Sequence, residues 1–445
     1  MKVNQEQKEA IIKLFHEMDS KDDFLGLLNK AKYFIYGEKY IPFEVNQLNY
    51  YINKDKNEIN KELLKRIAEL FDDNLPENSI ALDRGSLKKR SFYTEFTIKK
   101  KSGKDRVINA PIKGLKEFQK TLNIILQCIY EPHPAATGFV IGKSITHNAS
   151  LHINQNYVYN IDLKDFFPSI DKSRIWGRLL AEPFVLNSTP ERKKIANMIA
   201  VLCCHTMEVE RFLEGQWQKK VLSVLPQGAP TSPTLTNAIC EKLDIRLSGV
   251  AKRFCLNYSR YADDITFSSK HNTYELEKCN FENIYSSNST FNKEIKRIIE
   301  DQKFHIKESK VRLQKRGYRQ EVTGIVVNDK TNIYKRYIKQ LRQWLYFWEI
   351  HGYDKAYNFF IQKYLADKGH VKKGQPNMMM VLDGKLLYLK MVKGDNDSTY
   401  LKLKERFDNL INKHETKQTL KKENKNIVDL IFDIGLEKAM MKYKT

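Results

Sequence analysis

The sequence has no apolar run long enough to span a bilayer and no recognisable export signal. Its 445 residues are 41% hydrophobic, which is ordinary for a globular protein. The N-terminus begins Met1-Lys2-Val3 and lacks the basic-then-apolar pattern of a secretion signal. A membrane partner is therefore not expected. We expect a cytoplasmic chain that is large enough to form two to four structural units.

Cysteine is scarce, and none of the six cysteines belongs to a CxxC pair. The adjacent Cys203 and Cys204, followed by His205, come nearest to a zinc motif. Neighbouring residues seldom supply two ligands to one ion, and no matching pair follows. The sequence therefore favours buried, reduced thiols over a zinc site.

Acidic residues are fewer than basic ones, 54 against 76, which leaves a net charge of +22. The imbalance is uneven, because residues 1–90 carry 16 basic and 16 acidic side chains. Residues 91–445 therefore hold the whole excess, and we expect this part to bind a polyanion. A generally lysine-rich proteome is the alternative, but it would also charge the first ninety residues.

Two adjacent carboxylates, Asp263 and Asp264, lie between two short runs that are typical of strands, 256–260 and 265–268. This pattern predicts a hairpin with the aspartates at or beside its tip. Like charges so close together repel each other, which costs stability unless cations lie against them. Aspartate is also common in ordinary turns, so the pair alone is a weak signal.

A third carboxylate strengthens the interpretation. Residues 157–162 suit a strand that ends at Asp162. A cluster of Asp162, Asp263 and Asp264 would suit Mg²⁺, which prefers hard oxygen ligands and substrate phosphates. Two such ions about 4 Å apart can activate an attacking hydroxyl and stabilise a leaving pyrophosphate. The sequence therefore predicts nucleotidyl transfer.

Residues 93–111 predict a hairpin with a basic tip that includes Lys104 and Arg106. Guanidinium groups match phosphate oxygens, so Arg106 is the best candidate for gripping a triphosphate. The alternative is a solvated tip whose charges only discourage edge pairing. Residues 225–233, which contain three prolines and a glycine, predict a rigid loop that faces substrate or, alternatively, a purely structural turn.

Residues 334–364 are rich in aromatic and basic side chains. At helical spacing, an aromatic and leucine stripe would form core. A second stripe, of Lys335, Lys339 and Arg342, would contact backbone phosphates. An ordinary solvated face remains the alternative for the basic stripe.

The order of the Asp162 strand, the Leu225-Pro226-Gln227-Gly228 loop and the Tyr261-Ala262-Asp263-Asp264 hairpin resembles the palm of a reverse transcriptase. The resemblance covers about residues 93–330. Asn148-Ala149-Ser150-Leu151-His152 resembles the NAxxH element of bacterial retron enzymes, and Val322-Thr323-Gly324 resembles their VTG element. Alternatively, Asn148 and His152 form a helical pair that only holds structure.

The resemblance implies a role for each matching residue. Phe167 would exclude a ribose 2′-OH, Gln227 would line the nucleotide pocket and Lys310 could protonate pyrophosphate. It also implies metal binding and catalysis by Asp162, Asp263 and Asp264, and triphosphate binding by Arg106, beside which Lys104 is a further candidate. RNA binding is expected of Asn148 and His152 and, from the charge pattern, of the basic stripe Lys335, Lys339 and Arg342.

The resemblance also implies an α+β, right-hand polymerase fold. Its expected parts are a helical N-terminal region at 1–90, fingers at 91–155, a palm with fingers insertions at 156–330, a thumb at 331–400 and a C-terminal extension at 401–445.

Such an enzyme would use two Mg²⁺ ions and deoxynucleoside triphosphates. It would copy a cognate structured noncoding RNA into an RNA-linked single-stranded DNA, in anti-phage defence with an effector protein. Two alternatives remain open: a non-retron defence reverse transcriptase that primes on protein or makes repeats, and a catalytically silent RNA-binding scaffold.

Overall fold

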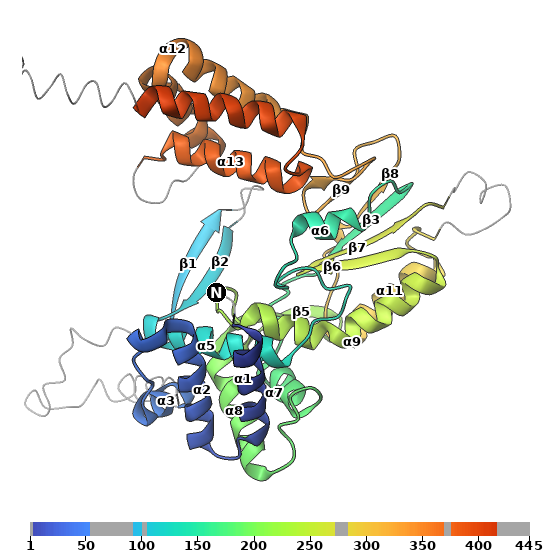
Figure 1. Cartoon of the computed structure of the whole chain (residues 1–445). Coiled ribbons are helices and arrows are strands. Elements are labelled where there is room, and N and C mark those ends of the chain that lie inside the picture. Colours follow the sequence, from blue (N-terminus) through green and yellow to red (C-terminus); the bar gives the residue numbers. More distant parts are fainter. Residues whose placement is uncertain (1–2, 54–91, 100–104, 272–283, 369–374, 416–445) are drawn as a thin grey trace, which may run out of the picture. The chain divides into compact units, whose positions relative to one another are not determined.

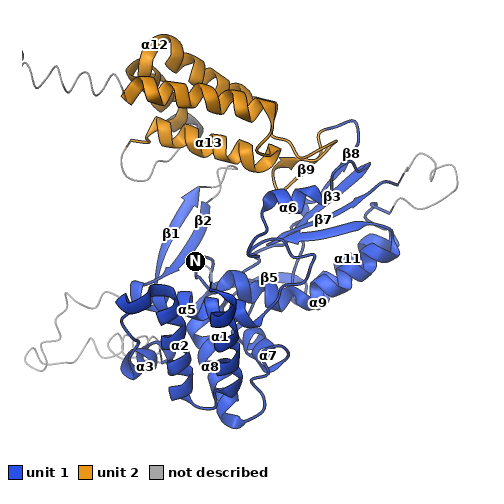
Figure 2. Cartoon of the chain, in the orientation of Figure 1, with its two compact units in different colours: residues 1–318 blue, residues 319–445 orange. Residues whose placement is uncertain are grey.

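The chain divides into two units, residues 1–318 and residues 319–445 (Figure 2). The computed structural model describes residues 3–53, 92–99, 105–271, 284–368 and 375–415 (Figure 1). The division falls ahead of the palm–thumb boundary expected at residue 330. Among the described helices, none has the length and apolar character needed to cross a bilayer.

A group of helices forms one part of unit 1. The first two begin at side-chain caps, because Asn4 and Ser20 each accept a hydrogen bond from the first helical turn. This agrees with the helical character expected here, although a further helix predicted at residues 62–71 lies outside the described residues. The helices are α1 (Gln5–Glu17), α2 (Lys21–Tyr36), η1 (Gly37–Lys39), α3 (Val45–Ile52), α5 (Lys113–Ile129), α7 (Lys172–Leu180) and α8 (Pro190–Cys203).

A four-stranded antiparallel sheet lies in the part of the chain where the palm is expected, with strand order β6-β7-β3-β8. Side chains alternate between the two faces of each strand. Helices α9 (Ser232–Arg253) and α11 (Thr290–Asp301) pack together against one face, where Phe267 meets Phe291 edge-on (Figure 1). The short helix α6 (Ile145–Ser150) contacts β6. The strands are β3 (Tyr157–Asp162), β6 (Asn257–Tyr261), β7 (Asp264–Ser269) and β8 (Arg312–Lys315).

Two hairpins stand apart from this sheet. Strands β1 (Tyr93–Lys99) and β2 (Asp105–Pro111) pair as the sequence predicted, while the tip at residues 100–104 lies outside the described residues. Strands β4 (His205–Leu213) and β5 (Gln216–Val224) form the second, longer hairpin. Fold class is confirmed as α+β.

Unit 2 begins with a small hairpin and continues into helices. Strands β9 (Glu321–Val322) and β10 (Ile325–Val326) are joined by Thr323 and Gly324, whose φ angles are 49° and 81°. Two positive φ angles favour glycine and suit a tight hairpin turn. Helix α12 (Lys335–Lys368) is interrupted at Gly352, and α13 (Met378–Lys393) and helical residues 398–415 follow. The predicted stripe of α12 is buried at Leu341, Leu345 and Trp348.

Candidate functional site

The strand register sets two of the three predicted carboxylates opposite each other. Asp162 ends β3 and pairs with Asp264, which begins β7. Partners across antiparallel strands project from the same face, so both carboxylates lie on one side of the sheet. Asp263 lies in the β6–β7 turn, where its carbonyl accepts a hydrogen bond of 3.0 Å from the backbone of Leu163. Segments far apart in the sequence therefore converge at one end of the sheet.

Burial and repulsion make Asp263 and Asp264 hard to ionise. Burial first, and then the charges of Asp263 and Asp162, raise the pKa of Asp264 to about 7. Burial and the charge of Asp162 also raise the pKa of Asp263. Lys310 and Arg106 act in the opposite direction, because a nearby cation favours the ionised form of Asp263. Ionising both carboxylates thus costs free energy that the nearby cations offset only in part.

Lys310 supplies the nearest of these cations. Its ammonium forms an ion pair with the Asp162 carboxylate. The lysine ends the short helix η2 (Glu308–Lys310), and the preceding Lys307 N–H donates to the Asp162 carbonyl at 2.8 Å. The Lys310 side chain is half exposed, whereas that of Asp162 is buried. Lys310 can therefore swing away without disturbing the core.

The donor set fits a divalent cation by its chemistry. Asp162, Asp263 and Asp264 offer hard carboxylate oxygens with an unmet negative charge, which Mg²⁺ would neutralise. Across the described part of the chain, however, no three His, Cys, Asp or Glu side chains are arranged to hold a metal ion. In this structure the Lys310 ammonium lies against Asp162, at the place where an ion would meet that carboxylate. These three aspartates would hold the ions once that ammonium moves.

Arg106 projects from β2 and is exposed. It lies close enough to the carboxylates for its charge to lower the pKa of Asp263. Arg106 thus lies within electrostatic range of Asp263. Lys104, the other residue expected to bind triphosphate, lies outside the described residues.

The proline-rich loop is joined to the strand that carries Arg106. The Gln227 carbonyl accepts a hydrogen bond of 2.8 Å from the Asn109 backbone N–H. Gly228 has a φ of 127°, and a Cβ placed on it would lie 2.8 Å from the Asn109 carbonyl oxygen. Glycine is needed here for both reasons. The loop therefore fixes Gln227, whose side chain is half-buried, beside the β1–β2 hairpin.

Phe167 belongs to an aromatic group beside the β6–β7 turn. Its ring centroid is 6.0 Å from that of Phe139 and 5.5 Å from that of Phe166. Phe139 in turn lies 6.5 Å from Tyr261, the last residue of β6. Phe166 is buried, but Phe167 keeps part of its surface exposed. Phe167 is thus the ring of this pair that a bound molecule could touch.

Asn148 and His152 were expected to bind RNA, but neither side chain reaches the surface in this structure. Both side chains are fully buried. Asn148 Oδ1 accepts hydrogen bonds of 2.7 Å from the hydroxyls of Thr137 and Ser259. The two His152 ring nitrogens lie 2.7 Å from the hydroxyls of Ser259 and Ser268. Asn148 and His152 therefore hold β6 and β7 in place. This geometry supports the alternative in which the two residues only hold structure.

A buried ion pair, not predicted from the sequence, supports the β6–β7 turn from the side of helix α9. Arg260 donates to both carboxylate oxygens of Asp244, at 2.8 and 2.7 Å, and neither side chain is exposed. The same guanidinium donates to the Ala262 carbonyl at 3.1 Å, within the turn. An arginine next to the aspartate hairpin was the available signal, but its α9 partner could not be inferred from spacing.

Gly138 lets another segment approach the turn closely. A Cβ placed on this glycine would lie 2.5 Å from the Ala262 backbone nitrogen. The preceding Thr137 N–H donates to the Arg260 carbonyl at 2.8 Å, and Asn237 donates to the Gly138 carbonyl at 2.9 Å. Three parts of the chain thus fix the backbone that carries Asp263.

The basic stripe lies in unit 2 and is described by itself. Lys335, Lys339 and Arg342 are all exposed on α12. Among the described residues, no ion pair is recorded for any of them. Their side chains are therefore available to solvent or to a polyanion.

The family model and the curated relatives that match this sequence point to the same protein family. A family model described as reverse transcriptase (RNA-dependent DNA polymerase) matches residues 98–343, which is more than half of the chain. Retron Mx65 reverse transcriptase of Myxococcus xanthus is 34% identical over 57% of this chain and 55% of its own length. Retron Mx162 reverse transcriptase of the same organism is 36% identical over 54% of this chain and 47% of its own. The chain thus spans about half the length of these relatives.

Solved structures give a weaker likeness. A telomerase from Candida albicans matches with 12% identity and a TM-score of 0.33, over 78% of this chain and 70% of the telomerase. The family assignment depends on the family model and the retron relatives instead.

Proposed function

Because this chain belongs to the reverse transcriptase family, we propose that it is an RNA-directed DNA polymerase. The observation that carries the proposal is the register that sets Asp162 opposite Asp264, with Asp263 on the adjoining turn. The nearby Arg106 and Lys310 add the cations that a triphosphate substrate would meet. A polymerase needs both features at one place.

The residues divide the work of nucleotidyl transfer. Asp162, Asp263 and Asp264 would hold divalent ions, whose positive charge activates the primer hydroxyl and offsets charge on the leaving group. Arg106 would bind the triphosphate, and Gln227 would lie along the nucleotide pocket. The primer oxygen forms a bond to the α-phosphorus while the bond to pyrophosphate breaks. Lys310 could then donate a proton to the pyrophosphate.

The proposed template follows from the names of the relatives and from two sequence elements. The two Myxococcus xanthus proteins are named as retron reverse transcriptases, and the Asn148–His152 and Val322–Gly324 segments resemble retron elements. We propose that this chain copies its own structured noncoding RNA from deoxynucleotides. The product would be a single-stranded DNA linked to that RNA, made in anti-phage defence with an effector protein. The exposed basic stripe of unit 2, Lys335, Lys339 and Arg342, would contact RNA phosphates.

Primer extension tests the catalytic proposal. We expect the purified full chain to extend a DNA primer on an RNA template with Mg²⁺ and deoxynucleotides. Asp263→Asn should lower the rate of primer extension at least about 100-fold, because it removes a carboxylate charge that would hold the divalent ions in the transition state. Its affinity for RNA should not change, whereas an RNA-binding scaffold would show no extension in either protein. Asp22→Asn, an exposed change on α2, is the matched control.

The nucleic acid that co-purifies with the protein tests the choice of template. Sequencing after separate digestion with ribonuclease and deoxyribonuclease should find one RNA joined covalently to one DNA. DNA without attached RNA, or DNA attached to the protein, would contradict the retron proposal and leave the polymerase proposal intact.

A further inference from the structure

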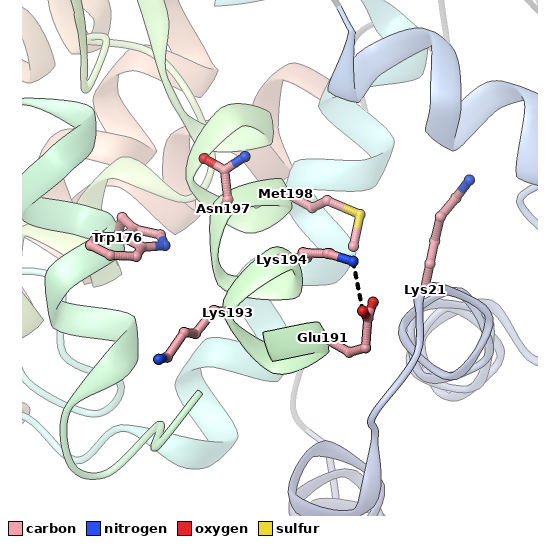
Figure 3. Close-up of a pocket in the computed structure, with 7 residues that line it drawn as sticks. All are labelled: Lys21, Trp176, Glu191, Lys193, Lys194, Asn197 and Met198. Atoms are coloured by element: carbon pink, nitrogen blue, oxygen red, sulfur yellow. Dashed lines mark hydrogen bonds and ion pairs between the residues drawn. The ribbon is translucent and has the colours of Figure 1, made fainter. Parts of the chain in front are cut away.

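A pocket of about 560 Å³ lies against helix α8 of unit 1 (Figure 3). Helix α8 buries Ile195 and Ile199 and presents Lys193, Lys194 and Asn197 to solvent, as expected at helical spacing. One further lining residue comes from α7 and another from the start of α2. None of these lining residues is among the catalytic carboxylates or their cations, so the pocket is a separate feature of the unit.

Trp176 of α7 is the most unusual residue of the pocket. Its side chain is 38% exposed. In the part of the chain that the structure describes, no ring contact and no hydrogen bond is recorded for its indole. Trp217 is similarly exposed at 43%, but its ring lies against Phe212 and His305. A large aromatic surface left uncovered in this way is costly in water, and a flat ligand would cover it.

The charged groups of the pocket are not equally available. Lys194 is paired with Glu191 at 2.6 Å, and Lys21 is hydrogen-bonded to Asn49. Lys193 is exposed and has no ion pair among the described residues. In Figure 3, Lys193 and Trp176 lie on the same side of α8, whereas Lys21 lies on the other. A cation without an ion pair among the described residues and a partly exposed indole therefore line the same pocket, on one side of α8.

We propose that this pocket binds one unpaired nucleotide of the RNA partner, with its base stacked on Trp176 and its phosphate at Lys193. This rests on the proposed function, because it assumes that the partner is RNA. Aromatic faces beside basic side chains are the usual means of holding single-stranded nucleic acid. A protein partner fits less well, since lysine is depleted in protein–protein interfaces. Asn197, which is exposed on the same helix, also lines the pocket.

The proposal predicts different signatures for the two residues. Fluorescence anisotropy of the full chain with a labelled single-stranded RNA of mixed sequence would give the affinity at several salt concentrations. Trp176→Ala should weaken binding about 5- to 100-fold, the range for one stacked base, with no change in the salt slope. Lys193→Ala should instead lower the slope of log K against log salt by about 0.7, the value for one lost phosphate contact. Trp176→Phe should keep most of the affinity.

Control variants distinguish the loss of a contact in the pocket from unfolding of the protein. The extension assay distinguishes it from failure of the proposed polymerase function. Tyr36→Ala removes an exposed aromatic residue at the end of α2, and Lys13→Ala removes an exposed lysine of α1; neither should matter. Extension of an annealed primer by Tyr36→Ala and by Lys13→Ala should match wild type. Unchanged RNA affinity in Trp176→Ala would overturn the pocket proposal while wild-type extension upholds the polymerase. If Trp176→Ala loses a co-purifying protein while its RNA affinity stays unchanged, the RNA proposal for the pocket is overturned and the pocket is a protein-binding site. Absent wild-type extension would count against the polymerase alone.

Discussion

At the scale of single residues, Lys310 lies where it competes with a divalent ion for Asp162. Its ammonium is paired with a carboxylate that belongs to the proposed metal site. The two partners differ in exposure, since the lysine is half exposed and the aspartate is buried. Lys310 therefore lowers the electrostatic cost of the ion-free site, and it must leave Asp162 when an ion binds.

We expect Lys310→Met to strengthen Mg²⁺ binding by the nucleotide-free protein. The gain should be up to about fivefold, because a partly exposed ion pair is worth at most about 1 kcal/mol. Isothermal titration calorimetry with Mg²⁺ would measure it. Lys307→Met is the matched control, since its contact with Asp162 is made by the backbone. Equal affinities in Lys310→Met and wild type would show that the ammonium does not compete.

Phe167 offers a second test at this scale. We expect Phe167→Ala to raise the ratio of ribonucleotide to deoxynucleotide incorporation about 10- to 100-fold, because the ring would no longer clash with a 2′-OH. Single-nucleotide extension with each triphosphate would measure the ratio. Phe166→Leu disturbs the buried neighbour and should leave the ratio unchanged. An unaltered ratio in Phe167→Ala would remove the residue from the proposed nucleotide pocket.

At the scale of elements, the β6–β7 hairpin is held from both faces of the sheet. Tyr258 and Arg260 face α9, where both bond to Asp244. Ser259 lies on the opposite face, in the buried network with His152. A turn that carries two repelling carboxylates gains little stability of its own, so these contacts fix its geometry.

The close approach at Gly138 makes this support testable. We expect Gly138→Ala to lower the maximal rate of primer extension by at least about tenfold, because displacing catalytic groups by about 1 Å can cost 100-fold. RNA affinity should stay near that of wild type. Gly249→Ala is the matched control, because a Cβ there would meet nothing within 4 Å. A normal rate in Gly138→Ala would show that the turn tolerates movement.

His152 makes the same element sensitive to acid. Burial lowers its pKa to about 3, whereas an unfolded histidine titrates near 6.5. Above about pH 6.5 the imidazole is neutral in both the folded and the unfolded chain. Below it only the unfolded chain gains a proton, so stability falls by up to about 1.4 kcal/mol per pH unit.

Urea denaturation of wild type and His152→Gln would detect this linkage. The stability advantage of wild type at about pH 7.5 should shrink by about pH 5, because only wild type must keep a buried imidazole neutral. The glutamine variant retains hydrogen-bonding groups and serves as the reference. A constant difference between the two pH values would contradict the linkage.

At the scale of the whole molecule, the sequence predicted the elements whose signals are local. The alternation before and after Asp263 was enough to place the hairpin, and its register confirmed the turn. The exposed face of α12 follows in the same way from helical spacing. Glycine and proline marked the loop around Gln227, although its attachment to β2 depends on a tertiary contact.

Features that depend on tertiary contacts were predicted less well. Nothing in the spacing of Asn148 and His152 indicates whether they face solvent or the back of a sheet, and the structure buries both. The partnership of Arg260 with Asp244 joins a strand to a helix and leaves no periodic signal. The uncovered ring of Trp176 is equally invisible in sequence, because exposure depends on the packing of α7 against α8.

The net charge of +22 gives the last prediction, which concerns RNA binding by the whole chain. Affinity for RNA should fall steeply with salt, because each phosphate contact releases counterions. Replacing Lys335, Lys339 and Arg342 together by glutamine should reduce the slope of log K against log salt by about two to three. Lys13→Gln, an exposed lysine of α1 within 3.9 Å of Glu17, should leave the slope unchanged. Equal slopes in wild type and the triple variant would mean that α12 does not contact the backbone of the RNA.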